Sequence, residues 1–335
     1  MSVDIPNYRI IEKLGVGAQT RVYRARYMPT GKDYTVKIVK IVNPEDAGFI
    51  ELLKAEHAVG SSIDHPVIRK VFELRMLRQR FRVRGAILFM EYVNGITLGQ
   101  KEFNLPHDEI LRIFSESAHG LYAMHIAGWV HADLKPNNIM LAVDGAVKLI
   151  DLGQSARIHE PKTKIQGTVD YMAPEQVQRG KLDQRTDVFG LGATLHKVLT
   201  GRAIATEMNQ TVNLQSLNPI VKRVEDVRAS VANGLPTCVA RLIDDCCRSD
   251  PGNRIPDMPS LIERIALART ILAKRNADDA APALPHEDHT KEKDEWDDGE
   301  SEDLAAIVDG LGLSEDDDQP IDIGDPETDV PPSRP

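Results

Sequence analysis

The chain has 335 residues, of which 41% are apolar and 27% charged, so it can bury a sizeable core in one large domain or two. No apolar run is long enough to span a bilayer, and the N-terminus has no basic segment followed by an apolar stretch, so neither a membrane span nor a secretory signal is expected. The net charge of −10 is unevenly distributed, because residues 276–335 carry 21 acidic and 3 basic residues whereas residues 1–275 carry 30 acidic and 38 basic ones.

The first part of the chain is rich in predicted strands. β-Branched and aromatic residues recur there in short runs separated by glycine-containing turns. A helical stretch interrupts these runs near residues 47–60. The five predicted strands are Tyr8–Leu14, Arg21–Tyr27, Tyr34–Val42, Val71–Leu77 and Arg84–Tyr92.

The second part, from Pro106 onward, is mainly helical. After Asp108 and Glu109, whose charges complement the dipole of a first helical turn, apolar residues recur at helical spacing until Gly128 ends the helix. Further apolar helices are predicted at Val188–Leu199 and Leu261–Leu272. These elements predict an α+β fold of two lobes, a small strand-rich N-lobe with one helix at about residues 8–92 and a larger helical C-lobe at about 95–273, with a cleft between them.

A glycine-containing turn joins the first two predicted strands in the run Leu14-Gly15-Val16-Gly17. Glycines let a hairpin backbone approach phosphate groups closely and direct N–H groups at them. By itself this pattern is also typical of an ordinary β-turn. The chain has no glycine-rich run ending in Gly-Lys-Ser/Thr, which disfavours a Walker-type nucleotide site.

Lys37 lies between apolar neighbours on the third predicted strand. A lysine at such a position can simply face solvent, but a buried one needs a counter-charge, and Glu56 on the following helix is the candidate. We expect this ion pair to hold Lys37 against nucleotide phosphates.

The strongest pattern is the run His131–Asn138, a loop stiffened by a proline. Its Asp133, Lys135 and Asn138 place three polar groups on one face. Asp151 follows at the start of an Asp-Leu-Gly motif. Carboxylate and amide oxygens are hard ligands that suit Mg²⁺, so Asn138 and Asp151 are candidate metal ligands.

The order of these motifs resembles the protein kinase family over residues 8–273. The glycine loop, the strand lysine, the helix glutamate, the catalytic loop and the Asp-Leu-Gly motif follow one another as in that family. Later matches are Gly167-Thr168, Tyr171–Glu175, Asp187 and Arg254. The resemblance implies a bilobal kinase fold and the transfer of the γ-phosphoryl group of ATP, with Mg²⁺, to serine or threonine hydroxyls of protein substrates.

The resemblance also implies roles for individual residues. Asp133 would receive or orient the proton of the substrate hydroxyl, and Lys135 would neutralise charge on the transferred phosphoryl group. Asn138 and Asp151 would hold the Mg²⁺ ions. Lys135 together with Thr168 favours serine/threonine over tyrosine as the acceptor.

The nucleotide site implied by the resemblance lies between the lobes. Lys37, paired with Glu56, would grip the α- and β-phosphates, and Met90 would guard the back of the adenine pocket. The other implied nucleotide-binding residues lie in the glycine loop, in the hinge between the lobes, and above and below the adenine: Leu14, Gly15, Val16, Gly17, Val22, Thr35, Glu91, Val93 and Met140.

Five positions depart from the family pattern: Thr20, Thr35, Gly60, Ala132 and Leu152. Ala132 stands where many relatives carry an arginine that pairs with a phosphate on the activation segment, so we expect activity that depends weakly on phosphorylation of residues 154–169, which include Thr163. Gly60 stands where relatives usually place a bulky apolar residue, and we expect a gap there and a mobile Glu56 helix that a partner or the tail would seat. Thr35 adds a hydroxyl above the adenine.

The acidic tail, residues 276–335, is predicted to be disordered because it cannot bury enough apolar surface to offset its ordering entropy. Its apolar island Leu304–Leu311 is a candidate site for a protein partner. The tail is interpreted as a solvated extension, an autoinhibitory segment lying across the basic body, or a docking motif. Its charge argues against nucleic-acid binding. Three clustered cysteines, Cys238, Cys246 and Cys247, predict reduced thiols and a cytoplasmic protein.

Two other functions stay open. The chain could be a pseudokinase scaffold that binds partners without turnover, which the intact set Lys37, Asp133, Asn138 and Asp151 disfavours. It could also phosphorylate a small metabolite, which the match to a peptide-binding platform at residues 167–175 disfavours.

Overall fold

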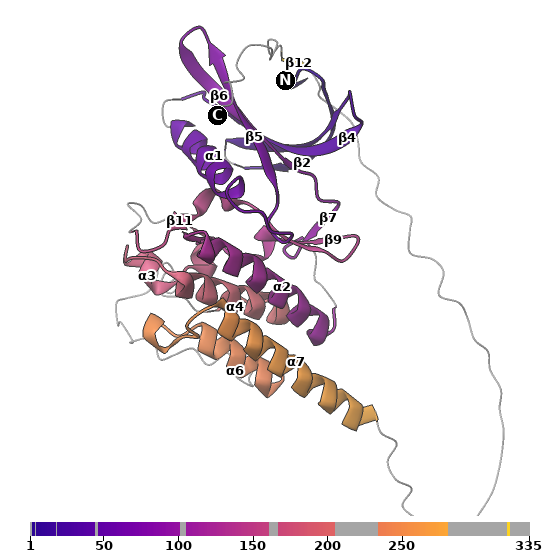
Figure 1. Ribbon diagram of the computed structural model, residues 1–335, viewed down its shortest axis with the longest axis vertical. Helices are drawn as coiled ribbons and strands as arrows, with labels where there is room; N and C mark the ends of the chain where they lie inside the picture. The colour runs from indigo at the N-terminus through magenta and orange to yellow at the C-terminus, as the bar shows by residue number, and fades with distance from the viewer. Residues whose placement is uncertain are drawn as a thin grey trace, which may run out of the picture.

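The computed structural model describes residues 2–3, 5–17, 19–43, 46–100, 105–160, 167–204, 234–280 and 320–321. They form a small strand-rich lobe and a larger helical lobe (Figure 1), which confirms the predicted two-lobed α+β fold. The predicted disordered tail, with its island at 304–311, lies outside the described residues except at 276–280 and 320–321.

The small lobe is built on one antiparallel sheet with the strand order β2-β3-β4-β6-β5. Because side chains alternate between the faces of a strand, Val36 and Ile38 of β4 join one apolar cluster, whereas Val39 packs on the other side with Ile50 and Leu53 of the helix α1. Lys37 shares this second face, which brings it toward α1. The strands are β2 (Tyr8–Val16), β3 (Thr20–Tyr27), β4 (Lys32–Lys40), β5 (Val71–Gln79) and β6 (Arg82–Glu91).

Helices α1 and α2 match the sequence prediction closely, and the large lobe packs its helices around one apolar core that also includes Val59 of α1. Among the described residues, no helix is both long and apolar enough to cross a membrane. The helices are α1 (Ala47–Gly60), α2 (His107–Ile126), α3 (Pro174–Val177), α4 (Gln184–Thr200), α6 (Thr237–Cys246) and α7 (Met258–Ala280).

Short strands lie along the junction of the lobes and were not predicted. Strands β7 (Gly95–Thr97), β9 (Ile139–Ala142) and β10 (Val147–Leu149) form an antiparallel sheet, and β8 (Trp129–Val130) pairs with β11 (Ala156–Arg157). Runs of two to four residues are too short for a period-2 pattern to be visible in the sequence. A parallel pair joins β1 (Ser2–Val3) to β12 (Pro320–Ile321).

Residues 67–69 are hydrogen-bonded through their main chain to the large lobe. Leu149 donates its N–H to the carbonyl of Val67 at 2.7 Å, and Arg69 donates to the carbonyl of Leu149 at 3.1 Å. Leu149 lies two residues before Asp151. The chain just before β5 of the small lobe is therefore anchored beside the Asp-Leu-Gly motif of the large lobe.

Two helix boundaries differ from the prediction. Helix α4 begins at Gln184 rather than Val188, because the Asp183 side chain accepts a hydrogen bond from the Arg185 N–H at 2.8 Å and caps the helix. Helix α7 continues to Ala280, into the segment assigned to the tail from residue 276.

The expected gap at Gly60 is absent, so that prediction was wrong. A Cβ added at Gly60 would lie 2.3 Å from Val71 Cγ2 and 3.5 Å from Leu152 Cδ1. The valine of β5 already fills the space that a side chain at position 60 would need. Helix α1 therefore packs closely on β5 and on the Asp-Leu-Gly motif, and the glycine is what permits that approach.

Candidate active site

A buried aspartate fixes the shape of the catalytic loop. Asp187 near the start of α4 accepts hydrogen bonds from the main-chain N–H groups of His131 (2.8 Å) and Ala132 (2.9 Å) and from His125 Nε2 (2.8 Å). Burial alone would raise the pKa of Asp187, but these donors outweigh it and lower the pKa. The carboxylate holds Ala132 in a left-handed conformation, with φ of 60°.

Three polar side chains meet just beyond this turn. Lys135 Nζ lies 2.8 Å from Asp133 Oδ2 and 2.9 Å from Thr168 Oγ1, and the Thr168 hydroxyl donates to Asp133 Oδ1 at 2.9 Å. Asn138 donates from Nδ2 to the main-chain oxygen of Asp133 at 2.7 Å. The predicted loop residues and Thr168, 30 or more positions away, thus converge on one carboxylate.

A second group of charges lies across the cleft. Lys37 Nζ contacts Glu56 Oε2 at 2.8 Å, as predicted, and also Asp151 Oδ1 at 2.9 Å. Asp151 takes a left-handed conformation, with φ of 61°, which turns its side chain back toward the small lobe. The sequence predicted the Lys37–Glu56 pair and singled out Asp151, but it did not predict that Lys37 would contact both carboxylates.

The charge balance sets the pKa values of this pair. Burial alone would lower the pKa of Lys37, but the carboxylates of Glu56 and Asp151 outweigh it, so the pKa is raised and the ammonium stays protonated. Burial would raise the pKa of Asp151, but the charge of Lys37 dominates and lowers that pKa to about 2. Asp151 is therefore a carboxylate at neutral pH.

Arg69 is the charged residue that sequence reasoning missed. Its Nη2 lies 3.1 Å from Glu56 Oε1, so the two oxygens of Glu56 are shared between Arg69 and Lys37. The side chains of Glu56 and Arg69 are 1% and 10% exposed. The signal available in the sequence was Arg69 itself, which stands with Lys70 between the apolar residues Val67-Ile68 and Val71, because charged residues are rarely buried unless paired.

The cleft between the lobes has a volume of about 450 Å³. Among the predicted site residues, Glu56, Glu91 and Asp133 do not line it. The Glu91 side chain instead bonds Lys148 of β10 at 2.8 Å and ties the hinge to the large lobe. The predicted residues that line the cleft are Leu14, Gly15, Val16, Gly17, Val22, Thr35, Lys37, Met90, Val93, Lys135, Asn138, Met140 and Asp151. The hinge residue Tyr92 also lines it, as do Arg69 and Gln100, which were not predicted.

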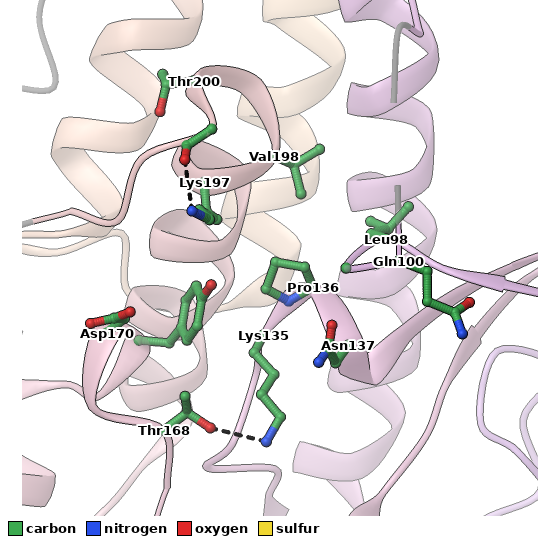
Figure 2. A pocket seen from close by; sticks show the side chains of 13 residues that line it. Leu98, Gln100, Lys135, Pro136, Asn137, Thr168, Asp170, Lys197, Val198 and Thr200 are labelled. Atoms are coloured by element: carbon green, nitrogen blue, oxygen red, sulfur yellow. Dashed lines mark hydrogen bonds between the residues drawn. The ribbon is translucent and has the colours of Figure 1, made fainter. Parts of the chain in front are cut away.

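A second hollow, of about 820 Å³, adjoins the catalytic loop. Figure 2 shows Lys135 extending toward Thr168 at one end, with Pro136 and Asn137 beside it and Lys197 and Val198 from α4 at the other end. Lys197 Nζ donates to the carbonyl of Gly201 at 2.6 Å, which holds it at the end of α4. The hollow therefore provides a surface beside Lys135 and Thr168 that an extended chain could occupy.

A bidentate ion pair braces the segment after Thr168. Arg254 Nη1 and Nη2 lie 2.7 and 2.8 Å from the two carboxylate oxygens of Glu175, and the Arg254 side chain is fully buried. The planar guanidinium suits a carboxylate in this geometry. Glu175 and Arg254, both part of the family resemblance, are thus joined over a separation of 79 residues.

The known proteins to which this chain is similar include several serine/threonine-protein kinases. Serine/threonine-protein kinases PknA of Corynebacterium glutamicum is 25% identical over 276 residues, which cover 80% of this chain and 57% of that protein. Serine/threonine-protein kinase PknB of Mycobacterium tuberculosis is 30% identical over 203 residues (58% of this chain, 32% of that protein). Serine/threonine-protein kinase AtPK2/AtPK19 of Arabidopsis thaliana is 27% identical over 272 residues (78% and 54%).

The chain spans less than two thirds of the length of each of these relatives. The family model described as protein kinase domain matches residues 8–264, which is most of the chain. That match, together with the two-lobed fold and the paired charges of the cleft, shows that the chain belongs to the protein kinase domain family.

Proposed function

We propose that this protein transfers the γ-phosphoryl group of ATP, with Mg²⁺, to serine or threonine hydroxyls of protein substrates. The observation that carries the proposal is the meeting of Asp133, Lys135 and Thr168 within hydrogen-bond distance, beside a cleft that contains the Lys37–Asp151 pair. One group is suited to a hydroxyl and the other to a phosphate chain and a metal ion.

We propose that the catalytic loop orients the substrate hydroxyl and neutralises the negative charge that develops on the transferred phosphoryl group. Asp133 accepts the proton of the substrate hydroxyl and holds that hydroxyl in line for transfer. Lys135 places its positive charge where negative charge develops, which is usually a large term in such reactions. Thr168 keeps both side chains in register through its hydroxyl.

The residues of the cleft fit Mg²⁺ and a nucleotide. Asp151 keeps 39% of its side chain exposed, and Asn138 uses its NH₂ group on Asp133, which leaves its amide oxygen for a metal. Both are hard oxygen ligands. The cleft volume, about 450 Å³, lies within the range of roughly 300–1,000 Å³ found for ligand pockets. When bound, ATP supplies the phosphoryl group and Mg²⁺ neutralises its charge.

Arg69 is proposed to position Glu56. When a nucleotide phosphate competes for the Lys37 ammonium, Glu56 would lose part of its counter-charge in a site that water does not reach. Arg69 remains on Oε1 and keeps the Glu56 carboxylate compensated. Because the main chain of Arg69 is bonded to Leu149, the pair also ties α1 to the large lobe.

Domain limits and location are part of the same proposal. The catalytic domain spans residues 8–273, with lobes at about 8–92 and 95–273, and the acidic tail begins after Ala280, where α7 ends. The peptide substrate lies along the hollow beside Lys135. The three cysteines of the protein are free thiols, which is consistent with a reducing, cytoplasmic setting.

The test uses radiolabelled ATP, Mg²⁺ and a generic basic protein substrate, with wild type beside Asp133→Asn. We expect label on serine and threonine of the substrate with wild type and a near-complete loss with the variant. Equal labelling by both proteins would refute the catalytic assignment. Nucleotide binding without any labelling would favour the pseudokinase scaffold, and label found only on a small molecule would favour the metabolite kinase.

A further inference from the structure

The turn between β5 and β6 carries an unusual surface. Together with the adjoining ends of the two strands, the turn contains four arginines within seven residues, Arg78, Arg80, Arg82 and Arg84, with Phe81 at the tip. All five side chains are exposed, and Phe81 is 102% exposed. We call residues 78–84 the arginine hairpin.

No side chain of these four arginines has an ion pair or a hydrogen bond to another described residue. Other arginines of the sheet do, since Arg24 and Arg26 both bind Asp33. The hairpin also contains no acidic residue, so its like charges lie close together without compensation. A positive surface with a bare phenylalanine at its centre fits a partner that offers both carboxylates and apolar groups.

The chain itself contains such a segment. Residues 304–313 include the apolar island Leu304–Leu311, and four consecutive acidic residues follow at Glu315–Asp318. Residues 281–319 lie outside the described part of the chain. The acidic run ends two residues before β12, which pairs in parallel with β1 of the small lobe.

The chain just after β1 packs in the same apolar cluster as the base of the arginine hairpin. Ile5, two residues after β1, is buried in a cluster with Ile87 and Phe89 of β6, and Leu77, the residue before the hairpin, packs against the same cluster. The 34 residues between Ala280 and Glu315 can extend over roughly 110 Å, ample to return from the end of α7 to the small lobe. Pairing through β12 would make docking intramolecular and raise the effective concentration of the acidic run.

We infer that the arginine hairpin is the docking surface for residues 304–318 of the same chain. Glu315–Asp318 pair with the four arginines, and the preceding apolar residues cover Phe81. This contact involves no residue of the catalytic loop, so it stands or falls independently of phosphoryl transfer.

The experiment places a photocrosslinker at the hairpin of the full chain as Phe81→p-benzoylphenylalanine. Mass spectrometry then maps the crosslinked peptides, and a mixture of isotope-labelled and unlabelled protein separates crosslinks within one chain from those between chains. We expect crosslinks within one chain to residues 304–319. Raising the salt from about 0.05 to about 0.5 M, which shortens the Debye length from about 14 to about 4 Å, should reduce their yield.

Charge reversal provides the specific test. Changing the four hairpin arginines to glutamate, or Glu315–Asp318 to lysine, should lower the crosslink yield at least about tenfold, because like charges then face each other. Combining both sets should restore it. A matched control changes four other acidic residues of the tail to lysine, Asp294, Glu295, Asp297 and Asp298, and should leave the yield nearly unchanged.

Several results would overturn the inference. Equal losses with the control and the Glu315–Asp318 variant would mean that the tail is attracted only by its total charge. Crosslinks between chains, or to regions other than 304–319, would assign the hairpin another occupant. If reversing the arginines abolished binding to a nucleic acid while leaving the crosslinks intact, the surface would belong to that ligand instead.

Discussion

Replacing Arg69 with methionine isolates the buried charge that the sequence did not reveal. Methionine keeps much of the side-chain length but removes the guanidinium that lies 3.1 Å from Glu56 Oε1. Because the Glu56 side chain is 1% exposed, water cannot take the place of that partner. Lys37 still contacts Oε2 at 2.8 Å, so the Glu56 carboxylate loses one of its two positive partners but is not left unpaired.

The magnitude follows from that geometry. A hydrogen bond to a charged group is worth about 1.5–3 kcal/mol, whereas fully breaking a buried ion pair costs about 3–5 kcal/mol. With one partner retained, we expect Arg69→Met to lose about 2–3 kcal/mol of unfolding free energy, which lowers the melting temperature by roughly 4–12 °C for a domain of this size. ATP affinity should fall about tenfold, because Lys37 is then the main counter-charge of Glu56.

The assay is thermal unfolding of the nucleotide-free protein, followed by an ATP titration. The matched control is Arg269→Met, which removes a guanidinium 2.7 Å from Asp108 in a pair that is 36% and 50% exposed. Such surface pairs contribute about 0–1 kcal/mol. Arg69→Lys should recover part of both losses. If Arg69→Met melted no lower than the control and bound ATP normally, Arg69 would not be positioning Glu56.

Three further predictions concern the packing of α1, the catalytic loop and the segment 154–169. Gly60→Ala should destabilise the protein by about 1–3 kcal/mol, since its Cβ would lie 2.3 Å from Val71 Cγ2, and Val71→Ala in the same chain should recover part of that loss in a thermal melt; an additive double variant would contradict the packing argument. Asp133→Asn should lower the rate of phosphoryl transfer by about 10²–10⁴-fold while nucleotide binding is kept, and near-normal turnover would exclude its role. Thr163→Ala, outside the described residues, should leave most kinase activity, because Ala132 offers no cation to a phosphate there; complete loss would refute this.

The sequence by itself determined the two lobes and the order of the motifs. Strand and helix patterns are local, so the periodicity of apolar residues predicted β2 to β6, α1 and α2 within a few residues of their observed limits. The spacing of Asp133, Lys135 and Asn138 is also local, because all three belong to one short loop. That this loop carries the chemistry stays a prediction, and it rested less on the loop's own residues than on the motifs at set distances on either side of it, whose order resembles the protein kinase family.

Only the tertiary structure decided how the charges are shared and where space remains. Lys37 and Asp151 are 114 residues apart, and Glu56 and Arg69 are 13 apart, yet their side chains form one continuous chain of contacts. The space beside Gly60 was also decided by the tertiary structure. The family pattern predicted a gap there, and the side chain of Val71 fills it. Counter-charges and cavities depend on side chains that meet across elements, and no spacing along a single element records those distances.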